Sequence, residues 1–298
     1  MSALRILLVT NPSAGSSADL DPAALHAQLG AFGEVESFAA SSAEELKSEI
    51  PEAARGADLI AVAGGDGSLN LVINALRGQL ESSTFLVLPG GTGNDLARTL
   101  AIPEDVLEAA DLAGSGRRCA LDVVEAQWDG GSHLFVNASM GGFTVQVNKK
   151  IDEDLKKKVG PLAFWIGGAM AAKDLERFTA TVNGESIVDC VALGVGNGRT
   201  CGGGVEIWPD ASPTDGLLDV CALPVSSALD AAKLLKRIKD GDHVELEGVR
   251  VFQVPEVKLE ADPPIELNLD GELVGLCTPA TFRIKGRAHF MIPPSLNL

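Results

Sequence analysis

The sequence predicts a two-lobed protein in which an α/β lobe with a parallel sheet precedes a β-rich sandwich lobe. In the first third, short apolar runs alternate with longer amphipathic segments, which is the pattern of a parallel sheet with helices on both faces. From about residue 121 the pattern changes to many short β-type runs, as in a sandwich or barrel. A chain of 298 residues is long enough to bury two cores.

The strands predicted for the first lobe span residues 5–10, 34–39, 59–63 and 84–88. Three of these runs end at Thr10, Ala63 and Leu88, and each leads into a loop that contains glycine or an Asn-Pro pair. Ligands of open α/β sheets bind beyond the carboxyl ends of the strands. We therefore expect the ligand-binding and catalytic residues of this lobe at this edge of the sheet.

The second lobe has more strands and fewer helices. Its predicted strands span residues 121–127, 133–138, 178–182, 187–195, 217–222, 249–259 and 265–269. Helices are predicted at 152–175 and 226–240. The last apolar run, 281–292, could complete this lobe or return to the first, and its pattern fits both.

Composition excludes several classes of function. Basic residues number 24 and acidic residues 41, and the net charge of −17 repels nucleic acid and leaves membrane contact to a local patch. No run reaches the ~18 apolar residues of a spanning helix, and the amino-terminal run is too short for a signal peptide. The five cysteines are odd in number and form no CxxC pair, so we expect a reducing cytoplasm.

Two glycine-rich loops follow neighbouring strands of the first lobe. Residues 64–70, GGDGSLN, and 89–98, PGGTGNDLAR, both lead from a buried strand into a helix. Glycine lets a backbone approach a ligand closely, and amides at a helix start favour an anion. One such loop is equally well explained as a tight turn with a capping Asp. Two in tandem indicate a phosphate site, and the turn NPSAG at 11–15 leaves the first strand in the same direction.

These motifs, in this order, resemble the catalytic-domain family of diacylglycerol and sphingosine kinases, in particular its bacterial soluble lipid kinases. The similarity continues at 195–199, 202–204, 209–211, 215–220 and 270–272, which covers nearly the whole chain. NAD kinases and phosphofructokinases share only GGDG. The resemblance implies a fold like that of NAD kinase and diacylglycerol kinase, with a nucleotide lobe at 1–120 joined by 281–298. The β-rich lobe at 121–280 would contribute the catalytic base and a structural metal site.

The resemblance also implies that ATP lies between the lobes, with its phosphates over the first glycine-rich loop. The residues implied as nucleotide contacts or their supports are Asn11, Pro12, Ser13, Ala14, Gly15, Gly64, Gly65, Asp66, Gly67, Ser68, Leu69, Asn70, Leu71, Gly91, Thr92, Asn94, Asp95 and Arg98. Asp66 is in addition a candidate catalytic group, because it could orient a metal-bound water.

The candidate base lies in the motif Asp270-Gly271-Glu272, and the resemblance does not decide between its two carboxylates. A plain Asp-Gly hairpin turn is the alternative interpretation. The loop at 212–217 resembles the family's magnesium loop, in which Asp215 would give a carboxylate and Ser212 and Leu217 further oxygens. A second Mg²⁺ would arrive with ATP.

The implied reaction transfers the γ-phosphoryl group of ATP to a lipid hydroxyl, with diacylglycerol as the leading substrate and phosphatidic acid as product. Alternatives are a kinase of a soluble acceptor such as NAD and a lipid- or nucleotide-binding protein without turnover. Lys149, Lys150 and 156–158 form the one dense basic patch, which could dock on anionic lipid at the inner face of the membrane or form a solvated helix face. The sequence leaves open whether the protein is a homodimer.

Overall fold

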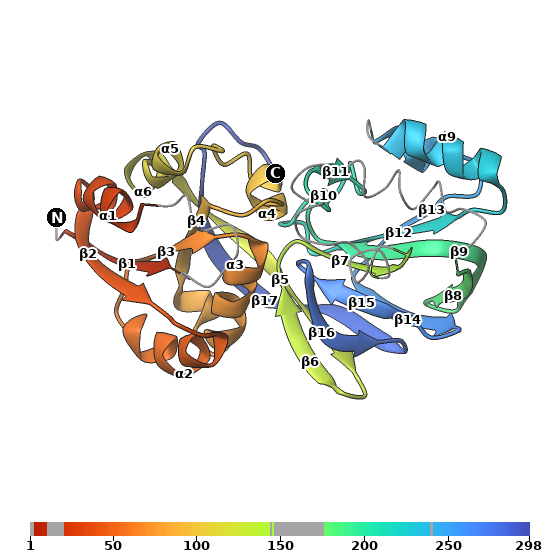
Figure 1. Cartoon of the computed structure of the whole chain (residues 1–298), viewed down its shortest axis with the longest axis horizontal. Coiled ribbons are helices and arrows are strands. Elements are labelled where there is room, and N and C mark those ends of the chain that lie inside the picture. Colours follow the sequence, from red (N-terminus) through yellow and green to blue (C-terminus); the bar gives the residue numbers. More distant parts are fainter. Residues whose placement is uncertain (1–2, 11–20, 144, 146–175, 239–240) are drawn as a thin grey trace. The chain divides into compact units, whose positions relative to one another are not determined.

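The computed structural model describes residues 3–10, 21–143, 145, 176–238 and 241–298. The chain divides into two compact units (Figure 1). The first comprises Met1–Val123 and Gly286–Leu298, and the second comprises Val124–Lys285. The nucleotide contacts implied for 11–15, the Lys149–Lys158 patch and most of the helix predicted at 152–175 lie outside the described residues.

The first unit is built on a parallel sheet with the strand order β2-β1-β3-β4-β17. Its strands are β1 (Leu4–Thr10), β2 (Gly33–Ala39), β3 (Leu59–Gly64), β4 (Thr84–Pro89) and the last residues of β17 (Ala280–Ile292). Every residue of β3 and β4 is buried, as expected for central strands covered on both faces. The run at 281–292 thus forms part of β17, whose end pairs with β4 in this unit.

Helices cover both faces of this sheet (Figure 1). They are α1 (Pro22–Gly30), α2 (Ala43–Ala53), α3 (Asp66–Ala75), α4 (Asp95–Thr99), α5 (Val106–Ala110), α6 (Leu112–Ser115) and the 3₁₀ turn η2 (Leu80–Ser82). Local sequence fixes several of their starts. Asp21, Ser42 and Asp105 each accept hydrogen bonds from amides of the following first turn, in α1, α2 and α5 respectively.

The second unit is mostly antiparallel. Its strands are β5 (Arg117–Trp128, in part), β6 (Gly131–Phe135), β7 (Ala138–Gly142), β8 (Phe178–Val182), β9 (Glu185–Gly196), β10 (Thr200–Cys201), β11 (Val205–Glu206), β12 (Leu218–Pro224), β13 (Arg250–Val254), β14 (Glu256–Asp262), β15 (Glu266–Leu269) and β16 (Glu272–Cys277). The order β16-β15-β7-β9-β8-β14 forms its main path, and β12 joins β9 to β13. Helix α9 (Ala228–Ile238) and the 3₁₀ turn η3 (Asp242–Glu245) follow β12.

Two of the predicted strands are wrong as single elements. The run 133–138 is split because the amides of Val136 and Asn137 donate to the Asp270 carboxylate instead of to a neighbouring strand. The run 249–259 is split at Pro255, which has no N–H for a ladder hydrogen bond.

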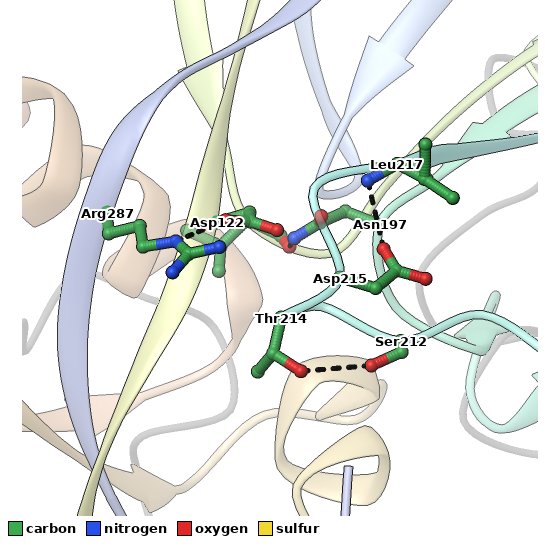
Figure 2. A network of polar contacts seen from close by, with 8 residues as sticks. Asp122, Asn197, Ser212, Thr214, Asp215, Leu217 and Arg287 are labelled. Atoms are coloured by element: carbon green, nitrogen blue, oxygen red, sulfur yellow. Dashed lines mark hydrogen bonds and ion pairs between the residues drawn. The ribbon is translucent and has the colours of Figure 1, made fainter. Parts of the chain in front are cut away.

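Strands β5 and β17 pair with each other, and each has residues in both units. Two buried carboxylates of β5 are neutralised by basic residues of β17. Asp122 accepts a hydrogen bond from Arg287 at 2.8 Å (Figure 2), and Glu125 pairs with Arg283 at 3.1 Å and Lys285 at 3.5 Å. Buried carboxylates need such partners, and these pairs link side chains of the two strands. Among the described residues, no helix is long and apolar enough to span a membrane.

Candidate functional site

The first glycine-rich loop leaves β3 at its carboxyl end and enters α3 at once. Gly64 is the last strand residue, Gly65 is the N-cap, and Asp66 opens the helix. A Cβ added to Gly64 would lie 2.6 Å from the Ser68 hydroxyl oxygen, so only glycine fits there. The first turn of α3 therefore stands at the sheet edge, where its amides favour an anion.

The second loop follows β4 and is closed by one side chain. Asn94 has the left-handed φ of 51°, its Oδ1 accepts from the Gly91 amide at 2.9 Å, and its Nδ2 donates to the Gly91 carbonyl at 2.7 Å. Asn tolerates this backbone conformation better than most residues. Arg98 donates to the Gly93 carbonyl and pairs with Glu104, so it supports the loop from its far end.

Asp66 joins the two loops. Its Oδ2 accepts from the Asp95 amide at 3.0 Å and its Oδ1 from the Leu96 amide at 3.1 Å, so it caps α4 from another part of the chain. The glycines complete the contact, because a Cβ on Gly91 would lie 2.5 Å from the Gly65 Cα. The Gly90 amide donates to the Gly64 carbonyl at 2.9 Å. The two loops are thus joined at one edge of the sheet.

The other residues implied for the nucleotide divide by exposure. Gly65, Asp66, Gly67 and Leu71 are half-buried at the edge, and Thr92 is exposed. Ser68, Leu69 and Asn70 are buried. The Asn70 Oδ1 accepts a hydrogen bond from the Asn74 side chain, one turn further along α3, so Asn70 forms a contact within the helix.

In the second unit, Asp270 is tied to the backbone. Its Oδ1 accepts from the amides of Asn137 and Ala138, and its Oδ2 from the amide of Val136, each at 3.0 Å. Its own amide donates to the Ala138 carbonyl at 2.8 Å, and its φ is 48°. Three backbone donors fix the position of this carboxylate and occupy both of its oxygens, which suits a positioning residue better than a base.

Glu272 has the opposite environment. It is an exposed residue by its accessible area, yet enough protein surrounds its carboxyl that desolvation, together with the charge of Asp270, raises its pKa above the ordinary glutamate value. Glu272 is therefore the better candidate for proton transfer.

The candidate metal loop precedes β12. The Asp215 Oδ1 accepts from the Leu217 amide at 2.9 Å, and the hydroxyls of Ser212 and Thr214 lie 3.1 Å apart (Figure 2). Ser212, Asp215 and the Leu217 carbonyl offer only oxygen donors, which is the donor set that Mg²⁺ prefers. In the described part of the chain, no three His, Cys, Asp or Glu side chains converge as a ready metal site. Carbonyl and water oxygens would have to complete the shell.

Asp219 and Gln253 were not predicted as site residues. The Gln253 Nε2 lies 3.5 Å from the Asp215 Oδ2 and 3.5 Å from the Asp219 Oδ1. Asp219 is 4% exposed, and desolvation raises its pKa to about 6, with the charges of Asp215 and Asp210 adding to the rise. The motif at 215–220 includes Asp219, but nothing in the sequence signals that Gln253, 34 residues further on, lies opposite it.

Comparison with known proteins identifies the family of both parts of the chain. Residues 5–126 match the diacylglycerol kinase catalytic domain, and residues 138–292 match the YegS C-terminal NAD kinase beta sandwich-like domain. A nucleotide-type α/β domain followed by this sandwich defines the class of lipid kinases of the diacylglycerol kinase type. Within that class, the chain belongs to the YegS-like family. The resemblance inferred from the motifs and the two-part fold are confirmed.

Similar proteins cover most of the chain. A protein of Stenotrophomonas maltophilia described as "Probable lipid kinase YegS-like" is 36% identical over 82% of this chain and 81% of its own length. A protein of Pseudomonas syringae pv. syringae with the same description is 35% identical over 78% of this chain and 74% of its own length. A crystal structure described as a diacylglycerol kinase from Bacillus anthracis has a TM-score of 0.77 and 26% identity, and it covers 98% of both chains.

Proposed function

We propose that this protein is a Mg²⁺-dependent kinase that transfers the γ-phosphoryl group of ATP to a lipid hydroxyl, with diacylglycerol as the first candidate acceptor. The observation that carries the proposal is the Asp66 carboxylate, which locks two glycine-rich loops together at one sheet edge in a chain of this family. Phosphoryl transfer depends mainly on positioning and charge neutralisation. The two joined loops present backbone amides at one edge and so serve the positioning of the phosphates.

The chain's own residues divide the remaining tasks. Glu272 accepts the proton of the attacking hydroxyl, since desolvation and the charge of Asp270 raise its pKa and make it a stronger base than an ordinary glutamate. Asp270 positions the turn that carries Glu272 through its three backbone hydrogen bonds. Asp66 acts by holding α4, and Thr92 offers an exposed hydroxyl on the second loop.

Magnesium has two proposed places. The loop with Ser212, Asp215 and Leu217 offers oxygen donors to a structural ion, and a second ion would accompany ATP and neutralise its phosphates. A cytoplasmic enzyme that meets its lipid at a membrane surface fits this reaction.

The test is an acceptor competition. Purified protein is incubated with labelled ATP and Mg²⁺ and with either diacylglycerol in mixed micelles, a bacterial lipid extract or NAD. We expect label in phosphatidic acid, and the variant Glu272→Gln, purified in parallel, excludes a contaminating kinase if it gives no label. Label in NAD alone would favour a kinase of a soluble acceptor. ATP binding without labelled product would favour a binding protein without turnover.

A further inference from the structure

Strand β12 carries a buried carboxylate oxygen that has no hydrogen-bond partner among the described residues. Asp219 is 4% exposed, and its Oδ2 contacts neither a donor nor a cation of the described chain. Burying a carboxylate without a partner costs free energy, because the water that it loses is not replaced. A partner from solution would remove this cost.

The burial of Asp219 has a clear cause. Asp219 stands directly opposite Gly196 on β9, and directly opposed residues of an antiparallel pair point to the same face. On that face the Trp208 ring fills the space beside Gly196, since a Cβ there would meet the ring at 2.4 Å. The buried indole therefore shields the Asp219 carboxylate from bulk water.

The same carboxylate borders the candidate metal loop. Gln253 stands opposite Asp219 on β13, and its Nε2 lies 3.5 Å from oxygens of both Asp219 and Asp215. One amide donor thus touches two carboxylates with like charges, which repel each other unless a cation or a proton lies near. The loop also supplies the hydroxyl of Ser212 and main-chain carbonyls.

We propose that Asp219 is a further ligand of the divalent cation held by the loop at 212–217, so that the site has two carboxylates and Gln253 orients both. This inference rests on the proposed magnesium loop and adds a residue to it. A site with two carboxylates, carbonyls and water suits Mg²⁺ or Ca²⁺. The cation would also give the buried Oδ2 of Asp219 the partner that it lacks among the described residues.

The test measures metal binding without nucleotide. Mn²⁺ binding is followed by electron paramagnetic resonance, and the melting temperature is measured with and without Mg²⁺, for the wild type, Asp219→Asn and Asp189→Asn. Asp189 is exposed with φ 58°, which Asn tolerates, so Asp189→Asn removes one charge away from the site. We expect Asp219→Asn to bind Mn²⁺ at least tenfold more weakly and to lose the Mg²⁺-dependent rise in melting temperature.

A purely structural Asp219 would give a different pattern. If Asp219 is a metal ligand, Asp219→Asn without metal should melt at or above the wild-type temperature, because a buried amide is less costly than an unpaired carboxylate. If Asp219 has a purely structural role, the same variant should melt below the wild-type temperature with and without metal. Wild-type Mn²⁺ affinity in Asp219→Asn would overturn the proposal. Absence of Mn²⁺ binding by the wild type would overturn it as well. Phosphate transfer by the wild type is scored separately, so the metal site and the kinase reaction can fail independently.

Discussion

The Asp66 carboxylate accepts a hydrogen bond from the Asp95 amide, 29 residues away, and so fastens the start of α4 to the first glycine-rich loop. The variant Asp66→Asn replaces a charged acceptor of two amides by a neutral group with one acceptor. We expect it to lose about 1 to 2 kcal/mol of unfolding free energy. We also expect at least tenfold weaker ATP binding, because the edge that presents the amides loosens. Urea unfolding and equilibrium titration with ATP measure the two effects.

Asp105 offers a matched control for this variant. Its Oδ1 accepts from the amides of Leu107 and Glu108 at the start of α5, so it is the same residue type in the same capping role. Asp105→Asn should lose less stability than Asp66→Asn, because the single Oδ1 that accepts both amides is kept, and it should keep wild-type ATP affinity. If Asp66→Asn bound ATP as well as Asp105→Asn does, the link between the loops would not be needed for the nucleotide.

The contact between the loops leaves no room for a methyl group at Gly91. A Cβ there would lie 2.5 Å from the Gly65 Cα and 2.9 Å from the Asn94 Oδ1. We expect Gly91→Ala to lose about 1 to 3 kcal/mol of unfolding free energy through overpacking. We also expect it to lose ATP binding, because the added methyl group pushes the two loops apart. Gly78→Ala is the control, since nothing lies within 4 Å of the added Cβ, and its stability should stay within about 0.5 kcal/mol of wild type. Equal behaviour of the two variants would show that the loops can separate without cost.

The sequence predicted the edge of the first sheet well, because strand ends and glycines are local signals. Buried runs with glycine after them located β3, β4 and both loops, close to their observed ends. Pro255 is also a local signal, and giving it more weight would have split the run 249–259 correctly.

The roles of individual carboxylates could not be predicted, because their partners are distant in sequence. Asp270 receives its hydrogen bonds from residues more than 130 positions earlier, and nothing near Asp270 in the sequence indicates this. Asp219 is buried by an indole that packs on a glycine of another strand. In each case the chain fold, and not the local pattern, separates a positioning carboxylate from one that can exchange a proton or bind a cation.

The pair Asp270 and Glu272 should respond differently to loss of charge. Glu272→Gln should lower kcat by about 10²- to 10⁴-fold with an unchanged unfolding free energy, because it removes only the proposed base. Asp270→Asn should lose about 1 to 3 kcal/mol of stability, since three amides lose a charged acceptor. Steady-state kinetics and urea unfolding measure both. A stable Asp270→Asn without activity, beside an active Glu272→Gln, would reverse the roles.

The pH profile gives an independent check on Glu272. A base must be deprotonated to act, so kcat/KM should fall as the pH drops through the pKa of Glu272. Because desolvation and Asp270 raise that pKa, the acid limb should lie above pH 4.5, the ordinary value for a glutamate. An acid limb at or below that value would count against Glu272.

His243 should make the second unit sensitive to acid. Its ring is fully buried, and Nε2 lies 3.1 Å from the Ile207 carbonyl oxygen, which can only accept, so Nε2 carries the hydrogen. Nδ1 is buried with no hydrogen-bond partner among the described residues. Protonation would place a charge there without an acceptor, and burial therefore lowers the pKa of His243 below 6.5.

The sign of the effect on stability follows from this lowered pKa. Below pH 6.5 the unfolded chain takes up a proton at His243 that the folded protein refuses, so the unfolding free energy falls as the pH drops toward the folded-state pKa. Urea unfolding between pH 7.5 and 5 should show a shallower loss of stability for His243→Gln than for the wild type. His26→Gln, at an exposed position, should follow the wild-type curve. Parallel curves for all three proteins would mean that the buried ring accepts its proton without penalty.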